Sequence, residues 1–139
     1  MELTLALLAD YANVTREGKL NVMGIFELIF AQSFPCNHVQ MALVMQFALE
    51  PFEAAGSHEI KVQLVDPDGK NLVQIKSTLT LPEKGPGIPA RIAHIQPLTN
   101  VAFPGPGDHE LRITVDEKLG RVVPLKVMLH PSRPPSKTP

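Results

Sequence analysis

Large apolar residues alternate with smaller or polar residues along much of this chain, most clearly in its first half. Every second residue from 39 to 49 is large and apolar: Val39, Met41, Leu43, Met45, Phe47 and Leu49. Successive side chains of a β-strand point to opposite faces of a sheet, so this spacing predicts a strand with one buried face. Shorter stretches of the same pattern occur at residues 60–64, 73–81 and 111–115. The chain is therefore predicted to be all-β.

Glycine, proline and polar residues separate the apolar stretches and mark the ends of the expected strands. We expect strands at residues 3–12, within 20–34, and at 39–50, 58–66, 70–81, 90–96, 100–103, 108–115 and 122–129. The residues Asp66-Pro67-Asp68-Gly69 fit a type I turn, with proline in its second position and glycine in its fourth. Gly24 indicates a bulge or a bend, and Pro124 indicates an edge position or a bulge in the last strand.

Eight to ten short strands without a fixed repeat predict one antiparallel two-sheet sandwich over residues 1–130. The pattern fits an immunoglobulin-like or a jelly-roll-like arrangement. The length of 139 residues suits a single domain. Residues 131–139 are rich in proline and basic, so we expect an extended or disordered tail there.

Two of the expected strands are apolar on both faces, although a sandwich strand needs only one apolar face. The second face would consist of Met23, Ile25, Ile29, Ala42 and Val44. A doubly apolar strand needs a second cover, which is either a loop of the same chain or another subunit. We expect a homodimer that buries these five residues. A bulge at Gly24 would exchange the two faces of its strand.

Charge and hydropathy narrow the choice of partners. The net charge is −1, and the residues before the tail hold 11 basic groups (13 − 2) against 14 acidic ones. The basic residues are scattered singly, which argues against nucleic-acid binding. The apolar run at residues 3–9 is short for a signal peptide and follows Glu2, so we interpret it as a strand. No run approaches the roughly 20 apolar residues of a membrane span. We expect a cytoplasmic protein without a membrane partner.

Candidate catalytic and metal-binding groups are few and isolated. The only cysteine, Cys36, excludes an internal disulfide, and a small buried side chain is favoured over a nucleophile activated by His38. The histidines lack the paired spacing that is typical of metal sites. A calcium loop starting at Asp66 would need glutamate where Ser77 stands, and Asp116-Glu117 is interpreted as a turn. The sequence therefore predicts no catalytic residue, no metal and no cofactor.

Three classes of function remain, and we rank them in this order. The first is a non-enzymatic interaction or structural module that associates with itself. A different protein as its partner belongs to the same class. The second is a sandwich that binds a small ligand or a carbohydrate in a cleft between loops 82–89 and 103–108. The absence of tryptophan and the single tyrosine leave few aromatic rings for stacking on a sugar. The third is an enzyme whose site is assembled from distant residues.

Two segments resemble a bacterial family of small proteins of unknown function. Residues 3–35, LTLALLADYANVTREGKLNVMGIFELIFAQSFP, carry the more specific part of the resemblance. PGDHELRITVD at 106–116, followed by VPLKV at 123–127, is similar to the closing hairpin of that family. The resemblance implies a single, broadly immunoglobulin-like sandwich. His109 stands where the family commonly has an aromatic residue such as tyrosine, so a tyrosine-corner contact is not implied. No catalytic residue carries over, because the family has no assigned activity.

Overall fold

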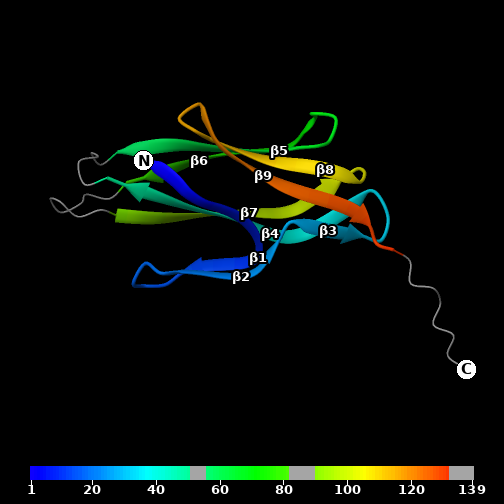
Figure 1. Ribbon diagram of the computed structural model, residues 1–139, viewed down its shortest axis with the longest axis horizontal. Helices are drawn as coiled ribbons and strands as arrows, with labels where there is room; N and C mark the ends of the chain where they lie inside the picture. Colours follow the sequence, from blue (N-terminus) through cyan, green and yellow to red (C-terminus); the bar gives the residue numbers. More distant parts are fainter. Residues whose placement is uncertain (51–55, 82–89, 132–139) are drawn as a thin grey trace, which may run out of the picture.

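Nine β-strands form two sheets that face each other, in a computed structural model that describes residues 1–50, 56–81 and 90–131 (Figure 1). The strands are β1 (Glu2–Val14), β2 (Leu20–Phe26), β3 (Leu28–Ala31), β4 (Cys36–Leu49), β5 (Ser57–Val65), β6 (Asn71–Thr80), β7 (Ala90–Phe103), β8 (Gly107–Val115) and β9 (Lys118–Leu129). Sheet A has the order β2-β1-β4-β7, and sheet B has the order β3-β9-β8-β5-β6. The prediction of an all-β, two-sheet sandwich is confirmed. Residues 132–139 of the predicted tail lie outside the described residues.

The strand pairs are antiparallel with one exception, β3 and β9, which run parallel. The exception arises because the chain leaves sheet A after Phe26 and enters sheet B at Leu28. The long apolar segment at residues 20–34 therefore forms two strands in different sheets. The backbone carbonyl of Glu27 accepts a hydrogen bond from the N–H of Lys126 at 2.8 Å, which fixes the crossing point against β9.

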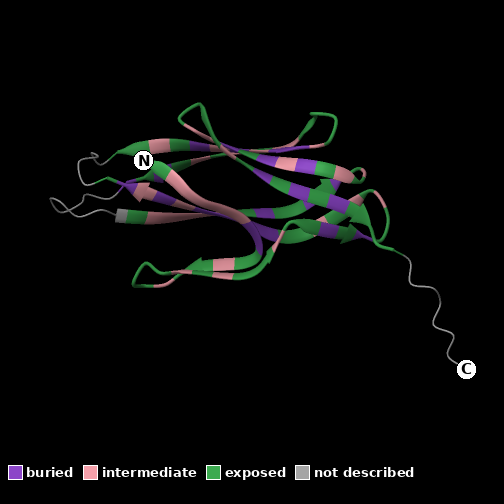
Figure 2. Cartoon of the chain, viewed as in Figure 1, coloured by how far each residue is buried: buried purple, intermediate pink, exposed green. Residues whose placement is uncertain are grey.

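The core between the sheets is built mainly from the apolar stripe of β4. Met41, Leu43, Met45, Phe47 and Leu49 are at most 2% exposed and face the buried residues Ile60, Leu64, Leu111 and Ile113 of sheet B. The alternation of buried and exposed positions is visible along β8 and β9 (Figure 2). Large apolar residues in strict alternation thus give each sheet one buried face.

The predicted start of this stripe is wrong, because Val39 is 67% exposed. The pairing of β4 with β7 is interrupted between His38 and Gln40, opposite Asn100, which has a positive φ of 51°. On the far side of this interruption, His38 lies opposite the buried Val101. The inward face of β4 therefore changes at Val39, from even positions before it to odd positions from Met41 onward.

Proline and turn residues behave partly as predicted. The carboxylate of Asp66 accepts hydrogen bonds from the backbone N–H groups of Asp68 (3.0 Å) and Lys70 (2.7 Å), which closes the predicted turn. β7 runs unbroken through Pro97, although we expected two strands there, because β7 is an edge strand that tolerates a missing donor.

Pro124 occupies an edge position within β9. It lies opposite Glu110 of β8, and pairing with β3 begins only at Lys126. Backbone N–H groups two residues apart point to the same side of a strand. Because the N–H of Lys126 points to β3, the nitrogen of Pro124 faces the side of β9 where no strand is paired, so no ladder hydrogen bond is lost.

Candidate interaction surfaces

The second apolar face of sheet A is covered by the chain itself. β1 pairs with β4 from Glu2 to Ala9 and with β2 from Leu8 to Val14. In Figure 1 the β1–β2 hairpin runs back below β4 and β7. Its residues Ala12, Leu20 and Val22 pack against a buried cluster of Ala9, Ala42 and Val44. The end of β1 and β2, which we call the hairpin, therefore fold back over β4 and form a third layer on the outer face of the rest of sheet A.

The expectation that five residues form one open face is wrong for three of them. Ala42 and Val44 are 7% and 0% exposed under the hairpin. Ile29 is 6% exposed, because the crossing from sheet A to sheet B turns it into the core between the sheets. Met23 and Ile25 are 65% and 62% exposed. Only the latter two remain candidates for contact with a partner.

Gly24 marks the place where the hairpin changes its inward face. Ala9 and Ala12 pack against the same cluster although strict alternation would place them on opposite faces. Between them, the register leaves out the pair of Asp10 and Gly24, and Gly24 has a φ of +73°. The predicted irregularity at Gly24 is thus present as a left-handed residue, with no register shift along the β1–β2 pairing.

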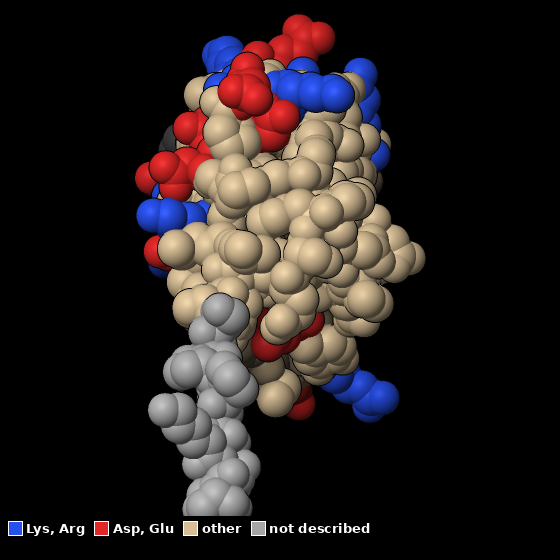
Figure 3. All heavy atoms as spheres, turned by 90° about the vertical axis from the view of Figure 1, so that its right-hand side faces the viewer, with Lys and Arg blue, Asp and Glu red and all other residues tan. Residues whose placement is uncertain are grey.

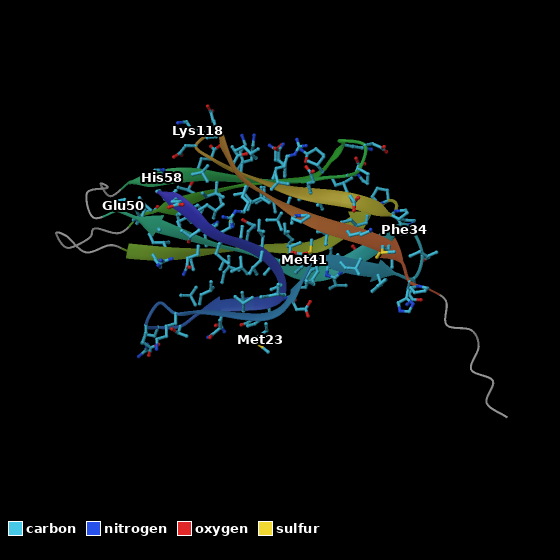
Figure 4. All side chains as sticks on the ribbon, viewed as in Figure 1. Met23, Phe34, Met41, Glu50, His58 and Lys118 are labelled. Atoms are coloured by element: carbon cyan, nitrogen blue, oxygen red, sulfur yellow. The ribbon has the colours of Figure 1, made fainter. Side chains whose placement is uncertain are left out.

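Two exposed apolar residues of the hairpin adjoin each other. We call Tyr11 and Met23 the hairpin patch; Tyr11 lies directly opposite Met23 and is 50% exposed. Ile25 is paired with the inward-facing Ala9 and lines a hollow with Val122 and Pro124, so it is not part of this patch. Figure 4 shows Met23 on the side of the hairpin that faces away from the sheets, whereas Met41 lies between them. A side-chain hydrogen bond from Asn21 Nδ2 to Asn13 Oδ1 at 3.0 Å joins the two strands of the same hairpin. Sequence analysis missed Tyr11, whose position follows only from the pairing of β1 with β2.

A second group of exposed apolar residues lies where β3 joins β9. Phe30 is paired with Met128, and the two are 49% and 39% exposed. The ring of Phe30 meets the ring of His130 edge to face, with centroids 5.4 Å apart. Lys126 lies in the same outward row, opposite Leu28, so this surface is interrupted by a charge. The hairpin patch is the more exposed of the two groups.

His58 and Asp116 form a polar pair at the start of β5. Nδ1 of His58 bonds Oδ2 of Asp116, and Oδ1 accepts a hydrogen bond from the N–H of Glu59 at 2.9 Å. The bond to His58, and next the bond to Glu59, lower the pKa of the Asp116 carboxyl. Asp116 and Glu117 both have positive φ and form the two-residue turn between β8 and β9. The pair therefore ties this turn to β5.

A second polar pair joins the edges of the two sheets. Ser77 Oγ of β6 lies 3.0 Å from Nε2 of His94 on β7, and burial lowers the pKa of His94.

Nε2 of His38 is buried and has no hydrogen-bond partner, so it does not bond the thiol of Cys36. His109 is 1% exposed, and its Nδ1 lies 3.0 Å from the carbonyl oxygen of Gly107. This contact stabilises the first residues of β8. In the part of the chain that the structure describes, no three His, Cys, Asp or Glu side chains gather as metal ligands.

The loop at residues 103–108 borders a shallow hollow rather than the predicted two-loop cleft. The hollow has a volume of about 330 Å³ and lies between the turn at 66–68 and Pro104, Gly105 and Pro106. Residues 82–89 lie outside the described residues; they connect the end of β6 to the start of β7 at Ala90, whereas the hollow lies beside the start of β6 and the end of β7. Figure 3 shows the end of the molecule where this hollow lies. Charged side chains gather on the sheet B side of that end, and most of the remaining surface in this view has no charged side chain.

Comparison with known proteins identifies the family. A model of a family described as having unknown function, DUF6941, matches residues 4–128. The chain belongs to this family. The match spans both segments that suggested such a family, so the predicted resemblance is confirmed. No curated protein matches this DUF6941 member.

Solved structures similar to this DUF6941 member share little sequence identity with it. One is a glycosyl hydrolase family 2 member from Bacteroides cellulosilyticus, with 12% identity, a TM-score of 0.43, and 90% of this chain but 15% of that chain covered. Another is an immunoglobulin-like protein from Pseudomonas aeruginosa, with 14% identity, a TM-score of 0.41, and 89% and 98% of the two chains covered. Likenesses of this strength say nothing about activity. No helix among the described residues is long and apolar enough to cross a membrane.

Proposed function

We propose that this chain is a non-enzymatic interaction module that associates with a second copy of itself through the hairpin patch. The observation that carries the proposal is the exposure of two large side chains, Tyr11 at 50% and Met23 at 65%, that lie opposite each other on one hairpin. Tyrosine and methionine are enriched in protein interfaces. Tyrosine adds contact area at low entropic cost, and methionine adapts to irregular surfaces. The other face of the same hairpin is already buried on sheet A, so the patch has no partner within the described part of the chain.

The polar pairs support the non-enzymatic part of the proposal. A catalytic pair needs a base that is free to take a proton from a reacting group. The carboxylate of Asp116 is bonded to His58 and to the backbone of Glu59, and both bonds hold a turn. Ser77 and His94 lie within hydrogen-bond distance, but no carboxylate among the described residues bonds the other ring nitrogen of His94 to orient it as the base of a serine–histidine pair. These groups have structural partners that account for their positions.

The test measures the mass of the protein in solution. We expect light scattering at micromolar concentrations to give twice the chain mass of 15.2 kDa. Met23→Asp and Tyr11→Asp should each weaken association by about 2 kcal/mol or more, which is about thirtyfold, because each would place an unpaired charge in an apolar contact.

The matched control is Leu119→Asp. Leu119 is as exposed as the patch residues, at 63%, but it lies near the turn between β8 and β9. It should leave the mass unchanged. A mass of 15.2 kDa up to several hundred micromolar for the unaltered chain would overturn the proposal, and so would equal losses from Leu119→Asp and Met23→Asp.

A further inference from the structure

We propose that the basic, proline-rich tail of this chain, residues 132–139, folds back and binds a hollow on the outer face of sheet B. This binding is independent of the proposed self-association. The hollow has a volume of about 370 Å³ and lies beside the start of β3, on β8 and β9. Leu28 and Pro124 contribute apolar side chains to it, and Glu27, Asp108 and Glu110 contribute carboxylates. We call it the acidic hollow.

The carboxylates of the acidic hollow are not neutralised within the domain. They outnumber its ammonium group, that of Lys126, by two (3 − 1). Asp108 lies opposite Lys126 in the strand register, but the two side chains form no ion pair. Glu27 is exposed and has no ion-pair partner among the described residues, whereas Glu110 is paired with Arg112 at 3.3 Å. Two of the three carboxylates are therefore available to a cationic side chain.

The tail has the composition that complements this surface. Residues 132–139 contain two basic residues, Arg133 and Lys137, three prolines and no acidic residue. Opposite charge draws such a segment to the carboxylates. Proline-rich segments lose little conformational entropy when they bind apolar grooves, because their backbone is already restricted. Charge and proline content thus both favour the acidic hollow as a binding site for the tail.

The tail starts close enough to reach the acidic hollow along an apolar path. The described chain leaves β9 at His130, next to the exposed pair of Phe30 and Met128. His130 lies six residues after Pro124, which is a distance of about 20 Å along a strand. Lys137 lies seven residues after His130, and seven extended residues span about 22 Å. Lys137 can therefore reach the carboxylates while the preceding prolines lie over Phe30 and Met128.

The test is cross-linking of the full chain with a carbodiimide, which joins a lysine directly to a carboxylate that contacts it. We expect mass spectrometry to find Lys137 joined to Glu27, Asp108 or Glu110 in a product with the mass of one chain. Leu28→Asn should lower the yield of this product about threefold, because it removes apolar contact but no group that is cross-linked. Leu119→Asn, at a position that is 63% exposed and outside the acidic hollow, is the matched control and should leave the yield unchanged.

A lower yield on adding salt would support the ion pairs of the tail, because salt screens exposed charges. The proposal is overturned if Lys137 forms no cross-link, or if it is joined in equal yield to carboxylates elsewhere, such as Asp10 and Asp68. Products of twice the chain mass would also overturn it, since the tail would then bind another copy. Equal yields from Leu28→Asn and Leu119→Asn would do the same. A chain that is monomeric in light scattering can still give the expected product, so failure of the proposed function is a separate result.

Discussion

The outer faces of the two sheets differ in composition, and they differ in what covers them. Sheet B presents Lys76, Thr78 and Arg112 directly to solvent. The corresponding face of sheet A presents small apolar residues, Ala9, Ala42 and Val44, and the β1–β2 hairpin lies over them. A polar outer face can remain in water, whereas an apolar one is stabilised by burial at roughly 25 cal/mol for each Å² removed from water. The comparison shows that the alternation of side chains indicates whether one or both faces of a strand must be covered. It does not indicate which part of the molecule covers the second face.

The small size of the covered residues explains why a two-stranded hairpin suffices as a layer. Alanine at positions 9, 12 and 42 lets the backbones approach closely, and Val22 and Leu20 fill the space between them. An isolated hairpin is at best marginally stable in water, so this contact is needed to hold it in place. The hairpin and sheet A therefore depend on each other.

The largest expected effect comes from placing a charge under the hairpin. Val44→Asp should destabilise the fold by about 4 kcal/mol or more, because Val44 is fully buried and the new carboxylate would have no partner. Thr78→Asp, on the exposed outer face of sheet B, should change stability by less than about 1 kcal/mol. Urea unfolding measures both. Equal midpoints for the two variants would show that the hairpin does not exclude water from sheet A.

A smaller effect is expected at the glycine that turns the hairpin. Gly24→Ala should cost about 2 kcal/mol, because a β-carbon at φ +73° is strained and would approach Asp10 Cγ to 2.9 Å. Gly18→Ala shares the positive φ, at +86°, but meets no atom within 4 Å, so it should cost about 1 kcal/mol. Thermal unfolding of the two variants separates strain from collision. If Gly18→Ala were the more harmful change, the close approach at Asp10 would have no energetic role.

The two sides of the hairpin can be compared with a matched pair of truncations. Val22→Ala should destabilise the fold by about 1 kcal/mol, since Val22 is half buried against sheet A. Met23→Ala should change the stability of the monomer by less than about 0.5 kcal/mol, because Met23 is 65% exposed. Chemical unfolding at dilution low enough to keep the chain monomeric is the measurement. The reverse order would mean that the inner and outer sides of the hairpin have been exchanged.

The smallest effect concerns the bond that links the edges of the two sheets. Burial lowers the pKa of His94, so between that lowered pKa and the usual value of about 6.5 the unfolded chain binds more protons than the folded one. Stability should therefore fall as the pH is lowered below about 6.5, and this dependence should be weaker in His94→Gln. Melting temperatures at pH 7.5 and 5.5 measure it.

Ser77→Ala is the control for this pH dependence. It removes the hydrogen bond to His94 but leaves the burial that causes the shift. The dependence on pH should therefore persist in this variant. Its disappearance would show that the bond to Ser77, and not burial, sets the pKa of His94.

Local patterns in the sequence account for much of the fold. The stripe from Met41 to Leu49 predicts β4, and Asp66-Pro67-Asp68-Gly69 predicts the hairpin of β5 and β6, because alternation and turn geometry depend on neighbouring residues. The change of face at Val39 could not be predicted in this way. It occurs where Asn100, 61 positions away in the chain, lies opposite the strand with a left-handed backbone.

The candidate surface could be predicted only in part, for the same reason. Met23 and Ile25 are exposed as expected, but Ala42 and Val44 have the same apolar character and are buried. Their burial depends on where the hairpin folds, which no local pattern reports. Tyr11 becomes part of the patch through its pairing with Met23, a contact between two strands that could be inferred only by treating residues 15–18 as a hairpin turn.

Pro124 affects whether another molecule can add a strand to the exposed side of β9. Upstream of Lys126, β9 has a side without a neighbouring strand, and at that point the proline offers no hydrogen-bond donor to an incoming one. An incoming strand would therefore lack one ladder hydrogen bond at this margin of sheet B, which protects the exposed side of β9 against pairing with the edge of another molecule.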